Sequence, residues 1–113
     1  DIKNADIVFD FHESLQSNYF NADYIGNTIS YNTNYIDAFK ISSLLRNKFP
    51  NKNWNTFNIA RNQNNLINGS LLQYCTNNEI PYILFETNKF EPIESRIDQT
   101  SIILKYIQNK YLT

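Results

Sequence analysis

Short, mostly apolar runs, separated by segments with helical periodicity, constrain the fold of this chain more than any other feature. Residues 5–11 (Ala-Asp-Ile-Val-Phe-Asp-Phe) and 82–85 (Tyr-Ile-Leu-Phe) are rich in β-branched and aromatic side chains. Both runs are shorter than an ordinary helix, and such runs are typical of strands buried within a sheet. The sequence therefore predicts at least two buried strands, one near each end of the chain.

The segments between these runs complete an alternating pattern. Two further strands are predicted at residues 25–31 and 54–59, and polar loops at residues 15–24 and 61–68. Helices are predicted at residues 36–49, after the N-cap Ser70, and after Pro92. Strands that alternate with helices indicate an α/β fold, with a layered mixed sheet that has helices on both faces.

Apolar spacing predicts which face of each long helix is buried. The apolar face of the first helix is marked by residues at approximately helical period: Ile36, Phe39, Lys40, Leu44 and Leu45. That of the last helix is marked by Ile97, Ile102, Ile103, Tyr106, Ile107 and Tyr111.

Composition limits the classes of function. The 113 residues fit one domain, and the formal net charge of -1, with scattered Lys and Arg, gives no basis for nucleic-acid binding. No apolar run is long enough to span a membrane, and the first residues show no targeting segment, so localisation is open. The single cysteine, Cys75, cannot form an internal disulfide and is expected to be a buried, inert thiol.

The only histidine, His12, follows the first predicted strand, where α/β folds place ligand sites. Asp10 lies two residues earlier and shares its face of the strand, so its carboxylate could orient the imidazole. His12 is then a candidate metal ligand; the alternative is an ordinary structural histidine. Glu13, which faces the other way, is expected to point to solvent.

Glu86 occupies the corresponding place after residues 82–85. Partial burial there would raise the pKa of its carboxyl group and suit it to proton transfer. The alternative is a helix cap or an ion pair, with Arg96 or Lys89 as partner. A catalytic zinc site needs about three protein ligands and a neighbouring carboxylate, and one histidine cannot complete it.

Two segments resemble the zinc metallocarboxypeptidases and their relatives, the succinylglutamate desuccinylases and aspartoacylases. Residues 5–14, ending in Asp-Phe-His-Glu-Ser, are similar to the strand that delivers the third zinc ligand, and Asp10-Phe11-His12 is similar to the Asp-Leu-His of the deacylases. Residues 69–74 and 80–87, ending in Phe-Glu-Thr, look like the carboxypeptidase block that ends in the catalytic glutamate. The interval between His12 and Glu86 also suits that pattern.

This resemblance implies a partial carboxypeptidase-like (phosphorylase/hydrolase-like) fold with one zinc ion, His12 as ligand and Glu86 as general base. In the family, the first two zinc ligands come from an upstream His-x-x-Glu motif, and substrate-binding arginines also lie upstream. Residues 1–113 are therefore expected to be the C-terminal portion of one catalytic domain. Leu71 matches a position that floors the specificity pocket; its alternative is helix core.

The activity implied is hydrolysis of an amide bond, with a peptide or an N-acyl amino acid as substrate. Residues 69–74 and 80–87 favour a metallocarboxypeptidase that releases a C-terminal residue, whereas residues 10–12 favour an N-acyl amino acid deacylase. A non-catalytic α/β binding domain with a relic site is the alternative of another class. Arg96 is expected to form a structural ion pair rather than a substrate clamp, and Tyr19, Phe20 and Tyr24 to pack rather than border a cleft.

Overall fold

The computed structural model describes residues 5–14, 27–58 and 70–112, and its elements follow the predicted order. They are β1 (Val8–Ser14), β2 (Asn27–Tyr31), α1 (Tyr35–Lys48), β3 (Trp54–Asn58), α2 (Leu71–Asn77), β4 (Tyr82–Asn88) and α3 (Ile93–Tyr111). The predicted loops at 15–24 and 61–68, with Tyr19, Phe20 and Tyr24, lie outside the described residues. No helix in the described ranges is both long and apolar enough to cross a membrane.

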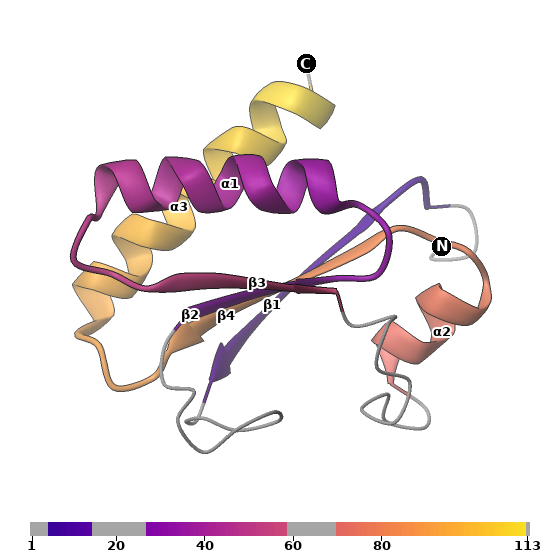
Figure 1. The fold of residues 1–113 in the computed structure, drawn as a ribbon, viewed down its shortest axis with the longest axis horizontal. Coiled ribbons are helices and arrows are strands. Elements are labelled where there is room, and N and C mark those ends of the chain that lie inside the picture. The colour runs from indigo at the N-terminus through magenta and orange to yellow at the C-terminus, as the bar shows by residue number, and fades with distance from the viewer. Residues whose placement is uncertain (1–4, 15–26, 59–69, 113) are drawn as a thin grey trace.

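The described strands form one mixed sheet of four strands in the order β1-β4-β2-β3. β1 is parallel to β4 and β2 is parallel to β3, while β2 and β4 are antiparallel. The sheet thus consists of two parallel pairs joined antiparallel at its centre (Figure 1). The predicted class, an α/β fold with a mixed sheet, is confirmed.

Helices cover both faces of this sheet because its strands alternate two sets of apolar side chains. One set packs with α1 and α3 in the main core, which includes Ile29, Trp54, Ile83, Phe85 and Ile103. The other packs with α2 in a smaller cluster formed by Cys75, Ile80 and Tyr82, with Val8, Leu71, Leu72 and Leu84 against it. Figure 1 shows α1 above the sheet and α2 below it, at the right of the view.

β1 lies three residues later in the sequence than predicted. The apolar run begins at residue 5, but the ladder with β4 begins at Val8 opposite Tyr82 and ends at Ser14 opposite Asn88. Pairing with β4 sets these bounds, and it extends the strand into polar residues that local hydrophobicity does not mark. His12 is therefore inside β1 rather than after it.

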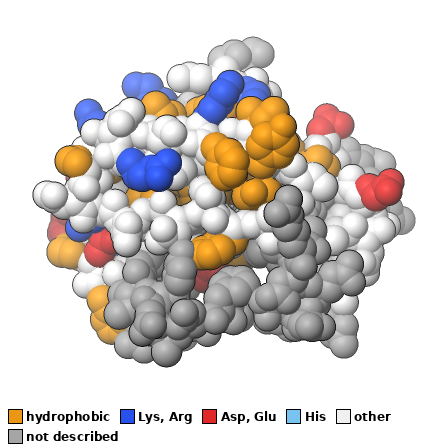
Figure 2. Space-filling view, in the orientation of Figure 1, with side chains coloured by type: hydrophobic (Ala, Val, Ile, Leu, Met, Phe, Trp, Pro, Cys, Tyr) orange, Lys and Arg blue, Asp and Glu red, His pale blue; other side chains and the backbone are white. Residues whose placement is uncertain are grey.

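Most of the predicted apolar face of α1 is exposed, and of its residues only Leu45 is buried. Ile36, Phe39 and Leu44 are exposed, and the buried residues are Asp37, Ala38, Ile41, Ser42 and Leu45. The buried set keeps helical spacing but contains two polar residues, so hydrophobicity alone selected the neighbouring face. On the α1 side of the molecule, Figure 2 shows hydrophobic side chains interspersed with Lys and Arg.

The buried carboxylate of Asp37 is stabilised by four side chains that donate hydrogen bonds to it. Oδ1 accepts hydrogen bonds from the Tyr106 hydroxyl and the Lys110 ammonium, each at 2.5 Å. Oδ2 accepts from Asn34 at 2.7 Å and from the Tyr111 hydroxyl. Burial alone would raise the pKa of Asp37, but these donors lower it from 3.8 to about 2. The carboxylate thereby joins the start of α1 to the end of α3.

The pH dependence of stability should report this contact. The pKa of Asp37 is lower in the folded chain than its ordinary value of 3.8, so its contribution is present above that pH and is lost as the pH falls towards 2. The shift corresponds to about 2 kcal/mol. In urea denaturation, the stability difference between the native sequence and Asp37→Asn should shrink by about that amount between about pH 5 and pH 2. A difference that stays constant over this range would contradict the assignment.

Candidate functional site

His12 and Glu86 are directly opposite each other on two neighbouring strands. They are paired residues in the parallel ladder of β1 and β4, each two residues before its strand ends. Paired residues on adjacent strands project from the same face of a sheet, so both side chains lie on the face that α2 partly covers. Asp10 shares this face because it lies two residues before His12. The structure therefore brings the three predicted site residues together.

Asp10 holds His12 through a direct contact. The Oδ1 atom of Asp10 lies 3.0 Å from Nε2 of His12. The other carboxylate oxygen, Oδ2, accepts a hydrogen bond of 2.5 Å from the hydroxyl of Tyr82. The His12 side chain is 57% exposed and that of Asp10 is 22% exposed, so Nδ1 of the imidazole remains for a ligand outside this contact.

Glu86 has the electrostatic setting of a proton acceptor. Burial raises the pKa of its carboxyl group above the ordinary value of 4.5. The charge of His12 acts in the opposite direction, and that of Asp10 raises the pKa further. A carboxylate whose pKa is raised binds a proton more readily than an exposed glutamate does.

The residues that could hold zinc are fewer than a complete site needs. Within the ranges 5–14, 27–58 and 70–112, no group of three His, Cys, Asp or Glu side chains is arranged to hold a metal ion. Both carboxylate oxygens of Asp10 already have partners, since Oδ1 contacts His12 and Oδ2 accepts a hydrogen bond from Tyr82. These side chains fit one zinc ligand, the carboxylate that orients it and a neighbouring base, and any further ligands would come from outside the described residues.

A shallow pocket at the end of β1 and β4 contains His12 but not Glu86. Its volume is about 260 Å³, and its lining consists of Phe11, His12, Glu13, Phe85, Thr87 and Thr100. Most of these side chains lie on the face towards α3, opposite the one that Glu86 shares with Asp10. This pocket therefore does not bring His12 and Glu86 together.

The secondary candidates have structural partners. Glu13 is exposed and forms an ion pair with Arg96 at 2.5 Å, and the Arg96 Nε also donates to the carbonyl of Glu91 at 3.2 Å. Leu71 packs against the small cluster around Cys75. Cys75 is buried, and burial raises the pKa of its thiol. Glu13 and Arg96 thus join β1 to α3.

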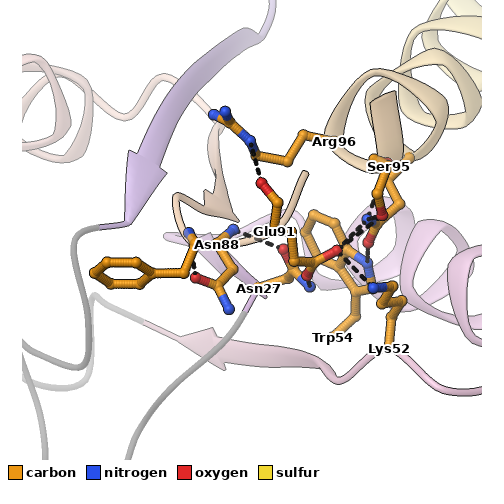
Figure 3. Close-up of polar contacts among 9 residues, drawn as sticks. Asn27, Lys52, Trp54, Asn88, Glu91, Ser95 and Arg96 are labelled. Carbon is orange, nitrogen blue, oxygen red and sulfur yellow. Dashed lines mark hydrogen bonds and ion pairs between the residues drawn. The ribbon is translucent and has the colours of Figure 1, made fainter. Parts of the chain in front are cut away.

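A polar network that the sequence did not indicate lies beyond the end of β4 (Figure 3). Oε1 of Glu91 contacts Lys52, Ser95 and Gln99, and Oε2 accepts from Asn27 at 3.0 Å. The Oδ1 of Asn27 accepts from the backbone N–H of Asn88 at 2.8 Å. These contacts fix the last residue of β4, two positions after Glu86, against the start of β2. We call this set the Glu91 network.

Comparison of the chain with protein-family models, with curated proteins and with solved structures gives no match. The functional interpretation therefore depends on the residues themselves and on the resemblance of residues 5–14, 69–74 and 80–87 to the carboxypeptidase segments.

Proposed function

We propose that the complete protein is a zinc-dependent amide hydrolase in which His12 is a zinc ligand and Glu86 is the general base. The observation that carries the proposal is the placement of Glu86 beside a His12 that Asp10 orients, on one face of the sheet. A carboxylate with a raised pKa next to an exposed, oriented imidazole supplies two of the groups that such a reaction requires.

In this proposal, bound zinc would polarise the scissile carbonyl group and lower the pKa of the attacking water. Glu86 accepts the proton of that water and later returns it to the leaving amine. Asp10 holds the imidazole of His12 so that one ring nitrogen faces the metal. Two further zinc ligands and the groups that bind the substrate carboxylate are required from elsewhere in the protein.

The preferred substrate is a peptide from which the C-terminal residue is released, with Leu71 contributing to an apolar pocket. This choice depends on the resemblance of residues 69–74 and 80–87 to the carboxypeptidase block. An N-acyl amino acid is the alternative substrate, which Asp10-Phe11-His12 favours. The two are distinguished by offering the protein both a blocked dipeptide and an N-acyl amino acid, and measuring the amine released from each.

Zinc content tests the proposal directly. The complete protein is expected to bind one zinc ion per chain. Losing a residue that only orients a metal ligand weakens metal binding by up to about a hundredfold. Because His12→Ala removes the ligand itself, it should weaken zinc binding by more than that. Mass spectrometry of bound metal and competition with a chelator would measure both. Glu13→Ala, the adjacent residue on the opposite face, is the matched control and should keep its zinc.

The 113-residue chain alone should bind zinc weakly and hydrolyse neither substrate, because it supplies one ligand among the described residues. Tight stoichiometric zinc on this chain would mean that the ligands are elsewhere than proposed. A complete protein without zinc and without amide hydrolysis would favour the alternative of a non-catalytic binding domain with a relic site.

A further inference from the structure

Tyr82, Asp10 and His12 form a series of three contacting side chains, in which Tyr82 is the most buried. Its hydroxyl donates to Oδ2 of Asp10 at 2.5 Å, and Oδ1 of the same carboxylate lies 3.0 Å from Nε2 of His12. Solvent exposure increases along this series, from 2% for Tyr82 to 57% for the His12 side chain. A buried group is thus connected through one carboxylate to the exposed imidazole.

The position of the Tyr82 hydroxyl is fixed by the backbone around it. The Oδ1 of the buried Asn32 accepts from the backbone N–H of Tyr82 at 2.9 Å, and the Asn32 N–H donates to the Tyr82 carbonyl at 3.2 Å. The Tyr82 ring packs in the small cluster with Cys75 and Ile80. A donor attached to so constrained a ring can define the orientation of the carboxylate that it contacts.

The chemistry of the Asp10 carboxylate makes this contact directional. Each of its oxygens has one described partner, so the plane of the carboxylate is set by Tyr82 on one side and His12 on the other. An ionised carboxylate only accepts hydrogen bonds, so it favours the tautomer in which the ring nitrogen that it contacts carries the proton. Burial raises the pKa of Tyr82 far above its ordinary value, so its hydroxyl remains a donor at neutral pH.

We propose that Tyr82 is a positioning residue that acts through Asp10 to hold neutral His12 in the Nε2–H tautomer, with Nδ1 as the nitrogen available to a ligand. The part of this inference that concerns zinc rests on the function proposed above. The part that concerns the tautomer depends only on the contacts among these three side chains.

Nitrogen-15 NMR of the 113-residue chain without added metal tests the tautomer. His12 is the only histidine in the chain, so its ring gives one set of signals. At about pH 9, where a histidine side chain is ordinarily neutral, the native sequence should show the Nε2–H form. Tyr82→Phe keeps the ring in its cluster but removes the donor, and it should shift both ring nitrogen signals towards an average of the two tautomers.

Tyr106→Phe is the matched control, because it removes the same kind of tyrosine–carboxylate bond at Asp37, on the opposite side of the sheet. It should leave the His12 signals unchanged. An unchanged tautomer in Tyr82→Phe, or an equal change in Tyr106→Phe, would overturn the inference.

Zinc binding by the complete protein separates this inference from the proposed function. Tyr82→Phe should weaken zinc binding by roughly ten- to a hundredfold, the usual effect of losing a partner that orients a metal-binding histidine, and Tyr106→Phe should not. If Tyr82→Phe shifts the tautomer but the protein binds no zinc, the proposed function fails while the positioning role of Tyr82 stands. If zinc binds but Tyr82→Phe changes neither the tautomer nor the affinity, the positioning role fails alone.

Discussion

Glu86→Gln is expected to lower kcat of the complete protein by roughly two to four orders of magnitude while zinc stays bound. Glutamine keeps the size and hydrogen-bonding shape of the side chain but cannot accept the proton of the attacking water. KM should change little, because the proton transfer occurs only in the transition state. Steady-state hydrolysis and metal content, measured on the same preparation, would show both effects.

Stability should not explain the loss of activity in Glu86→Gln. Burial raises the pKa of Glu86, so the ionised carboxylate is less favourable in the folded chain than in the unfolded chain at neutral pH. Replacing it with a neutral amide should therefore leave the melting temperature unchanged or raise it. Glu13→Gln, at the same end of the sheet but on its opposite face, is the matched control and should keep near-native turnover.

Two results would contradict this assignment of roles. Near-normal turnover in Glu86→Gln would make Glu86 an ordinary half-buried carboxylate. Loss of zinc in Glu86→Gln, as expected for His12→Ala, would make Glu86 a ligand instead of a base.

Glu91→Ala should lower the free energy of unfolding by about 2–3 kcal/mol, the scale for removing a charged acceptor from buried donors. The Glu91 side chain is 12% exposed and contacts Lys52 at 3.0 Å. Its removal also takes an acceptor from the amide groups of Asn27 and Gln99, both of which are buried. Gln99 keeps its hydrogen bonds to Ser95, so Asn27 is the residue that loses most.

Urea denaturation would measure this effect by comparing the free energy of unfolding of Glu91→Ala with that of a control variant, Asp98→Ala. Asp98 is an exposed acid on α3, so its loss should cost no more than about 0.5 kcal/mol. Glu91→Gln keeps the size of the side chain but removes the charge that faces Lys52, and its stability should lie between those of the two alanine variants. A Glu91→Ala protein as stable as Asp98→Ala would show that the Glu91 network contributes little.

The sequence predicted the elements of the fold better than their contacts. Strands and helices occur in the predicted order because each has a local signal, such as Ser70, whose hydroxyl accepts from the backbone N–H of Gln73 at 3.1 Å. The burial of Asp37 on α1 could not be predicted, because most of its partners are distant in the sequence. Tyr106, Lys110 and Tyr111 lie on α3, and no local pattern connects them to α1.

The same reason limits what could be predicted of the candidate site. Asp10 and His12 are related by strand periodicity, so their shared face could be expected, and the side-by-side placement of His12 and Glu86 follows once β1 pairs with β4. Tyr82 was assigned to an apolar strand core, because nothing near it in the sequence shows that its hydroxyl meets Asp10 across two strands. The Glu91 network was missed for the same reason.

The position of β4 has a consequence for how the chain folds as it is made. β4 is the last described strand in the sequence, yet it lies between β1 and β2. On the ribosome, β2, α1 and β3 emerge in succession and can close into a parallel unit early, whereas β1 finds its partner in the described sheet only after residues 82–88 have emerged. The nascent chain therefore carries a strand with open backbone groups until residues 82–88 have emerged, which is the kind of segment that chaperones protect.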